Sequence, residues 1–256
     1  MRNSVFSTAL LVMVLACGPA WAAAPATAPY NWTGFYAGLN TGMAINDSGY
    51  TLSPSGSFLT NPLYIPTNGL ITDSGNLGNV AFTIGAQLGY NYQVGCFVYG
   101  LETDFNYDGT DNTSYVNRPL ASPLSGNIVH TVQQKVDFFG TLRARFGYTP
   151  ADRFLIYGTG GLAYGNVSSS SNVAFTSSGD NYSGSSSGLQ AGWTLGAGSE
   201  YALTKCWSVK LEYLYIDLGS RSYTYAAQPR FGSSFTYTTD LDTTQHIVRV
   251  GLNYKF

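Results

Sequence analysis

The sequence is poor in charged side chains, and after its first residues it has no long apolar run. Only 10% of its 256 residues are charged, against roughly 25% in ordinary soluble proteins. The formal net charge of −2 gives no sign of the basic patch that a nucleic-acid-binding protein presents. Beyond Cys17 no stretch approaches the roughly 18 consecutive apolar residues of a membrane helix. We therefore expect neither a nucleic-acid partner nor a helical anchor.

What is abundant points to β-structure. Aromatic residues make up 15% of the chain, including 20 Tyr, and there are 30 Gly. A disordered chain would be poor in core residues and would lack the aromatic and β-branched residues that are present here. Few charges with many Tyr and Gly favour a β protein whose wall has little contact with water.

The N-terminus reads as an export signal. Arg2 precedes an apolar run from Val5 to Cys17, and small residues follow up to Ala24. This order is typical of a secretory signal peptide, which we place at residues 1–23, with a short leader at 24–31. A lipoprotein signal at Cys17 is the alternative.

Eight stretches of alternating polarity follow in residues 32–256. Each is near or above the roughly 9–11 residues that a tilted strand needs to cross a bilayer. Their ranges are 32–45, 80–92, 97–107, 130–148, 154–167, 189–203, 206–218 and 244–256. All eight lack Pro, as strands that donate to a ladder require.

The connections alternate between short and long. Residues 93–96, 149–153 and 204–205 form tight turns, whereas residues 46–79, 108–129, 168–188 and 219–243 are long and polar. Short turns on one side and long loops on the other are typical of a transmembrane β-barrel. A secreted β-sandwich also has many short strands, but it does not predict this alternation.

The two faces of each strand favour the membrane. In the fourth stretch Leu142 and Phe146 share one face, and Arg143 and Arg145 share the other. The apolar rows are large and end in Tyr, Trp or Phe, as expected of a wall that faces lipid around a polar interior. We predict an all-β, eight-stranded antiparallel up-and-down transmembrane barrel.

The expected inward rows carry four acidic and four basic side chains. An eight-stranded barrel is just wide enough for side chains to fill, and unpaired charges there cost several kcal/mol each. We therefore favour a salt-bridged filling over a pore lined by opposite charges. The predicted network consists of Glu102, Asp104, Arg143, Arg145, Glu200, Lys210, Glu212 and Arg249.

The last strand, His246 to Phe256, alternates most cleanly. It must pair with the first, Trp32 to Asn40, because closure leaves no edge exposed in hydrocarbon. Its spacing of Gly251, Tyr254 and Phe256 resembles the C-terminal signal by which outer-membrane barrels are recognised for assembly.

Histidine and cysteine give little sign of chemistry. His130 and His246 each open a strand, and we expect both at the outer rim as interfacial side chains. A metal or haem contact through the loops, and a His/Ser hydrolase acting on lipid A, remain the alternatives. We assign no catalytic residue, metal ligand or cofactor.

The two cysteines of the barrel are predicted to stay unbonded. Cys96 and Cys206 fall at tight turns on opposite sides of a barrel about 16 Å wide. A disulfide requires Cα atoms within about 7 Å of each other.

Several segments together resemble one known family. These segments are WTGFYAGLN (32–40), FVYGLETDF (97–105), GTLRARFGYTPADRFLIYGTGGLAYG (140–165), GWTLGAGSEYALTKCWSVKLEYLYIDLG (192–219) and IVRVGLNYKF (247–256). The chain resembles the porin-family, opacity-type outer-membrane immunogenic proteins of alphaproteobacteria. The resemblance implies an OmpA-like barrel in the outer membrane, with roles in envelope integrity and host contact and no agreed catalytic residues.

The expected function is therefore that of an integral outer-membrane surface antigen rather than an enzyme. A small diffusion porin is the first alternative, and an outer-membrane enzyme acting on lipid A is the second. The expected partners are outer-membrane lipid and lipopolysaccharide, the barrel-assembly machinery, and a host or surface ligand of the loops.

Overall fold

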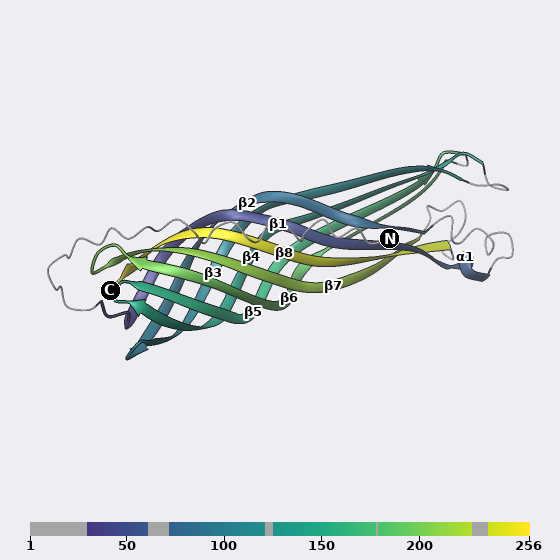
Figure 1. Cartoon of the computed structure of the whole chain (residues 1–256). Helices are drawn as coiled ribbons and strands as arrows, with labels where there is room; N and C mark the ends of the chain where they lie inside the picture. The colour runs from purple at the N-terminus through teal and green to yellow at the C-terminus, as the bar shows by residue number, and fades with distance from the viewer. Residues whose placement is uncertain (1–29, 61–71, 121–124, 178, 227–234) are drawn as a thin grey trace.

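The computed structural model describes residues 30–60, 72–120, 125–177, 179–226 and 235–256. The predicted signal peptide, residues 1–23, and most of the leader lie outside these residues. Eight antiparallel strands form a closed barrel in sequence order (Figure 1), which confirms the predicted fold. Their bounds are β1 (Gly34–Gly56), β2 (Asp73–Val94), β3 (Phe97–Pro119), β4 (Asn127–Ala151), β5 (Phe154–Phe175), β6 (Asp180–Ala202), β7 (Trp207–Ala226) and β8 (Phe235–Lys255), with a short helix α1 (Ser57–Thr60).

The barrel closes between the first and last strands, as predicted. Tyr36 of β1 faces Lys255 of β8, and Leu39 faces Leu252. The predicted first strand began at Trp32, but β1 begins at Gly34. Trp32 instead packs with Val98, Leu155 and Tyr157 inside the end of the barrel.

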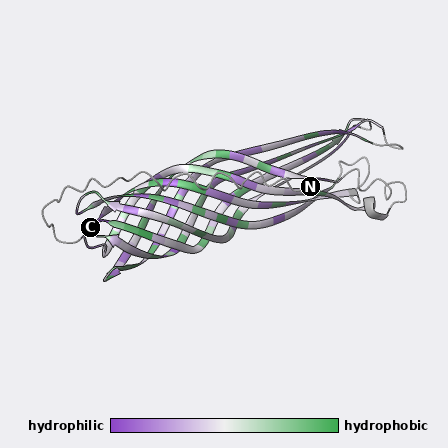
Figure 2. Ribbon diagram, viewed as in Figure 1, coloured by the Kyte–Doolittle hydropathy of each residue, from purple (hydrophilic) through white to green (hydrophobic). Residues whose placement is uncertain are grey.

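An apolar belt surrounds the half of the barrel nearer the C-terminus. Leu142, Leu211 and Leu252 point outward and are 53%, 47% and 44% exposed. Phe97, Trp193 and Trp207 are exposed on the same surface. In Figure 2 the hydrophobic segments gather over this half, and the opposite ends of the strands are mostly polar. The outward direction of the apolar rows is the one that the alternation predicted.

The strands are longer than expected, and most of each predicted long loop is strand. The ranges 46–79, 108–129, 168–188 and 219–243 were expected to be loops, yet β1, β3, β5 and β7 continue to Gly56, Pro119, Phe175 and Ala226. Backbone hydrogen bonds do not depend on apolar side chains, so Ser- and Thr-rich strands continue the ladder. Residues 61–71, 121–124, 178 and 227–234 of the expected loops lie outside the described residues.

Among the described residues, three prolines lie within strands, although the prolines were expected only in the signal, the leader and the connections. Pro54, Pro119 and Pro150 occupy the ends of β1, β3 and β4. Pro54 lies beyond Leu52, the last β1 residue that pairs with β2, and faces Tyr237 of β8. A strand end with one missing neighbour tolerates the lost N–H donor.

The polarity of the wall inverts above the belt. In β8, Val248 and Val250 point outward, but farther from the C-terminus Leu241 and Tyr237 are buried and Asp240 and Asp242 are exposed. Register shifts in β4 between Val136 and Phe138, and in β7 between Asp217 and Ser220, accompany the change. The part above the belt, which we call the extension, therefore has an apolar core and a polar surface, as a water-facing β-sandwich has.

The extension separates into two sheets. The β2–β3 ladder starts at Thr83 facing Asp108, and the β6–β7 ladder starts at Trp193 facing Asp217. The other ladders continue outward, so one sheet contains β3–β6 and the other contains β7, β8, β1 and β2. Figure 1 shows these two groups diverging at the end away from the C-terminus.

The two sheets share one interior. Leu52 of β1, Val173 of β5 and Tyr237 of β8 belong to one buried cluster, and Leu77 of β2 packs with Val132 of β4 in another. A third cluster, around Phe139, Leu214 and Ile247, lies between these and the charged residues of the belt. Among the described residues, no helix is long and apolar enough to cross a membrane.

Candidate functional site: the charged lumen

The structure brings all eight predicted lumen charges together inside the belt. Adjacent strands place opposite charges side by side: Glu102 faces Arg143, Glu200 faces Lys210, and Glu212 faces Arg249. Each of the eight residues is at most 4% exposed. This arrangement follows from the two-residue period of a strand, which sends alternate side chains to the same face.

Glu102 lies at the centre of the cluster. Its Oε1 atom pairs with Arg143 Nη2 and lies 2.9 Å from Lys210 Nζ. Its Oε2 atom lies 3.3 Å from Arg145 Nη1 and accepts a hydrogen bond of 2.7 Å from the Tyr36 hydroxyl. One carboxylate thus meets cations from both β4 and β7.

Arg249 links the carboxylates of Asp104 and Glu212. Its Nη2 atom lies 2.7 Å from Asp104 Oδ2 and 2.6 Å from Glu212 Oε2. Arg143 reaches the same two carboxylates at 2.9 Å and 3.1 Å. Charge-assisted contacts of this length are the stronger class of hydrogen bond, and here they cross the lumen from β4 to β8.

Glu200 lies closer than the other acidic residues to the end of the barrel where the C-terminus is. It lies 2.9 Å from Arg145 Nη2 and accepts hydrogen bonds from Ser208 and Asn253. The guanidinium of Arg145 also lies 3.9 Å from the centre of the Tyr157 ring, a distance at which a cation is attracted to an aromatic face.

Tyr36, Tyr157 and Asn253 complete this network but were not singled out in the sequence. All three lie on the inward rows of their strands, which is the one signal that would have found them. Tyr157 donates a hydrogen bond of 2.8 Å to Glu212. Inward position alone does not say which polar side chains will bond to a charge.

The second buried polar cluster lies in the extension and is centred on His130. His130 Nδ1 lies 2.9 Å from Asp73 Oδ2, and Nε2 lies 3.1 Å from Ser171 Oγ. Ser171 Oγ lies 2.7 Å from the Tyr225 hydroxyl, and Arg118 pairs with Asp73 at 3.2 Å. The cluster thus connects β2 and β7 of one sheet with β3, β4 and β5 of the other.

The predicted place of His130 at an interfacial rim is wrong. The strand was expected to begin at His130, but β4 begins at Asn127, and His130 is 2% exposed. Burial lowers the pKa of His130, and the hydrogen bond to Asp73 and the charge of Asp73 oppose that effect. His246 lies instead on the outer surface, where its Nδ1 atom is 2.7 Å from the Tyr213 hydroxyl.

The predicted assembly residues lie along β8. Phe256 is 77% exposed and packs edge-on against Tyr254, which also contacts Trp207. Gly251 points inward, where an added Cβ would lie 3.0 Å from the side chain of Lys210. The two aromatic side chains thus extend the outward row, and Gly251 leaves space for the lumen charges.

Cys96 and Cys206 both carry free thiols. Cys96 lies in the turn between β2 and β3, and Cys206 lies between β6 and β7. Within the described ranges, no group of three or more His, Cys, Asp or Glu side chains is arranged to hold a metal ion.

Comparison with known proteins agrees with this architecture. The model of the outer membrane protein beta-barrel domain family matches residues 8–256. The chain is 40% identical over 240 residues to the 31 kDa outer-membrane immunogenic protein of Brucella melitensis, covering 91% of this chain and 88% of that protein. It is 32% identical to the 22 kDa outer membrane protein of Rhizobium leguminosarum bv. viciae, over 66% of this chain and 63% of that one.

Among solved structures, the outer membrane protein OprG of Pseudomonas aeruginosa is similar, with a TM-score of 0.48 and 14% identity over 89% of this chain and 98% of that one. The family match spans nearly the whole chain, and it agrees with the closed barrel and its apolar belt. The chain therefore belongs to the outer membrane β-barrel protein family and is a protein of the bacterial outer membrane.

Proposed function

We propose that this protein is a closed structural barrel that stabilises the outer membrane and presents its extension at the cell surface. The mutual pairing of the eight lumen charges carries the proposal. Each charge has at least one opposite partner within 3.3 Å. Removing one partner of such a buried pair typically costs about 3–5 kcal/mol, so the network opposes any opening of the lumen.

A small diffusion pore is the main alternative. It requires the charges to line water rather than to meet one another. Swelling of liposomes that contain the purified protein tests it: we expect no swelling above that of protein-free liposomes in small sugars. Reproducible swelling that depends on sugar size would favour the pore.

The extension supports the second half of the proposal. It carries the strands well beyond the belt, and its outer surface is polar. We include contact with a host or surface ligand through the extension in the proposal, and its polar outer surface supports this part. We expect a deletion strain to become more sensitive to detergents, and we expect the wild-type gene to restore resistance.

A hydrolase is the weakest alternative, although Ser171, His130 and Asp73 have the connectivity of a nucleophile, a base and an orienting acid. A triad is identified by its geometry and roles. Here Ser171 is 2% exposed and bonded to Tyr225, so a substrate does not reach it. Unchanged lipid A profiles in His130→Ala and His246→Ala strains are the expected result.

Assembly is expected to proceed through β8, with the assembly machinery recognising Gly251, Tyr254 and Phe256. The exposure of Phe256 supports this proposal. A Phe256→Ala variant is expected to fold more slowly into the outer membrane and to accumulate unassembled. Leu252→Ala, at an outward position of the same strand, is the control. It separates recognition of the C-terminal signal from a general loss of apolar surface.

A further inference from the structure

One surface of the extension carries unusually small side chains and almost no charge. We call it the serine face and define it as the outward side chains of residues 131–135 in β4, 168–172 in β5 and 183–187 in β6. Within these three ranges, all of which the structure describes, Lys135 carries the only charge. Its Nζ atom lies 2.9 Å from Asp137. Water-facing surfaces normally carry many charges of both signs, so solubility alone does not explain this composition.

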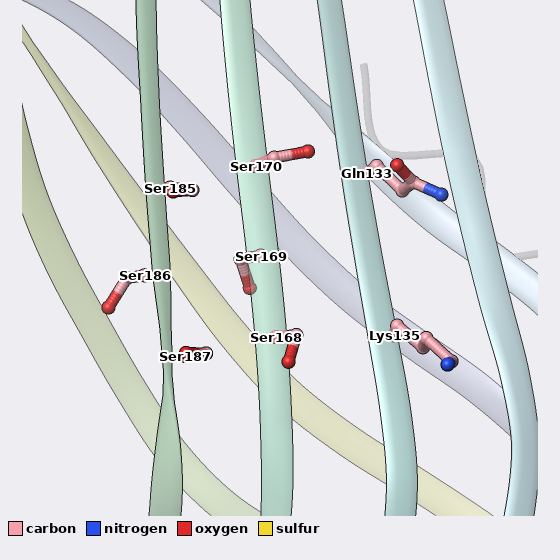
Figure 3. A pocket seen from close by; sticks show the side chains of 8 residues that line it. All are labelled: Gln133, Lys135, Ser168, Ser169, Ser170, Ser185, Ser186 and Ser187. Atoms are coloured by element: carbon pink, nitrogen blue, oxygen red, sulfur yellow. The ribbon is translucent and has the colours of Figure 1, made fainter.

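The serine face is hollowed. Gln133 and Lys135 stand on one side of the short side chains of Ser168 and Ser170, and β6 lies on the other side (Figure 3). The register places Gln133, Ser170 and Ser185 in one row. Two adjoining hollows, of about 270 and 380 Å³, lie along this row. Their size is near the lower end of that of small-ligand pockets.

The position of the serine face restricts its occupant. Directly below it, Leu189 belongs to the lipid-facing belt and is 63% exposed, and Leu162, farther down β5, is 65% exposed. Ser187 is separated from Leu189 by Gly188 alone. In the outer leaflet, the part of the surrounding glycolipid that lies immediately above its acyl chains, and so beside the serine face, is its saccharide.

The chemistry of the serine face also matches a saccharide. Hydroxyl and amide groups both donate and accept hydrogen bonds, as sugar hydroxyls do. The exposed ring of Tyr115 in β3 faces Thr131 at the rim of the hollow and offers an apolar surface to the C–H face of a sugar. Two carboxylates lie beside the serine face, and both have partners there: Asp137 pairs with Lys135, and Asp111 accepts a hydrogen bond from Gln133. The opposite sheet presents Asp47, Asp240 and Asp242 outward, and these three carboxylates repel an anionic glycolipid.

We propose that the serine face binds the saccharide of lipopolysaccharide molecules in the outer leaflet, and that this saccharide lies along β5. This inference rests on the proposed surface-presenting role and does not depend on a closed lumen. Swelling or conductance would overturn the closed lumen and leave the saccharide site standing.

The first test uses the full chain in detergent micelles and delipidated core oligosaccharide as the probe. Binding is measured by calorimetry and by saturation-transfer NMR. A Ser168→Val/Ser170→Val variant removes two hydroxyls of the serine face, and a Thr224→Val/Thr238→Val variant removes two from the opposite sheet. We expect the first variant to lose about tenfold or more in affinity and the second to match the wild type. Absence of binding to the wild type, or equal losses in both variants, would overturn the proposal.

A second test works in the membrane. A fluorescent label on Ser170→Cys, in a Cys96→Ser/Cys206→Ser background, reports access of an aqueous quencher. We expect quenching to fall when lipid A in the vesicles is replaced by lipopolysaccharide with a complete core. A label on Thr238→Cys is expected to change little. Equal quenching of Ser170→Cys in both vesicles, or binding of soluble host glycans in place of the core, would contradict the proposal.

Discussion

The ring of Tyr36 occupies the space that a side chain at Gly89 would fill. A Cβ atom added to Gly89 would lie 2.3 Å from Tyr36 Cζ. The absent side chain allows the Tyr36 hydroxyl to reach Glu102, to which it donates a hydrogen bond of 2.7 Å. The glycine on one strand therefore determines a contact at the centre of the charged lumen.

Substitution of Gly89 is expected to destabilise the barrel. Gly89→Val forces Tyr36 away from Glu102, and overpacking of this kind typically costs about 1–3 kcal/mol. Urea unfolding from lipid vesicles measures the change. Gly78→Ala is the control, because a Cβ there meets only the Asn46 carbonyl oxygen at 3.9 Å. Equal stability of Gly89→Val and the wild type would contradict the packing described here.

Glu102 is expected to be the most sensitive of the lumen carboxylates. Glu102→Gln removes the charge that faces Arg143, Arg145 and Lys210, at a cost of about 3–5 kcal/mol in the free energy of unfolding. Adding Lys210→Met should recover part of the loss, because it removes one cation left without its partner. Additive losses in the double variant would show that the two charges do not interact.

The exposed pair Lys135–Asp137 provides a contrast with the lumen. Its side chains are 52% and 35% exposed, and water screens such pairs strongly. Asp137→Asn is expected to leave unfolding in urea nearly unchanged. A loss comparable to that of Glu102→Gln would show that the unfolding assay does not distinguish buried from exposed charges.

The extension is expected to lose stability in acid. Because burial lowers the pKa of His130, the folded protein favours the neutral ring, and the unfolded chain binds more protons below the ordinary pKa of about 6.5. Stability therefore falls as the pH drops through and below that value. Asp73 and Arg118 face this cluster together with the hydroxyls of Tyr50 and Tyr225, and burial raises the pKa of both tyrosines.

Limited proteolysis of the extension from about pH 7.5 to about pH 5 measures this effect. Cleavage of the wild type is expected to accelerate in acid, and His130→Gln should remove most of the pH dependence. His246→Gln is the matched control and should retain it. An unchanged pH profile in His130→Gln would assign the acid effect to other groups.

The sequence predicted the belt better than the extension. Within the belt, the outward row of Leu142 and Phe146 differs strongly in polarity from the inward row of Arg143 and Arg145. This contrast reveals both the strand and its faces. In the extension, Val167 and Val173 flank four serines and an asparagine, a run that resembles a loop, so the strand signal is weak. The register shift between Val136 and Phe138 exchanges the faces of β4, which no period-two pattern extended from the belt anticipates.

The same contrast explains what was predicted of the charged lumen. Inward charges are conspicuous in the sequence, and their equal numbers of each sign indicate pairing. Their neutral partners Tyr36 and Tyr157 resemble the aromatic residues of the outer surface. Only the three-dimensional register distinguishes the two kinds of tyrosine.

Single-channel recording from the purified full chain in planar lipid bilayers tests the central claim most directly, because paired charges that fill the lumen leave no path for ions. We predict no stable conductance steps over the voltage range that the bilayer itself withstands. Reproducible ohmic steps that scale with salt concentration would contradict the closed lumen.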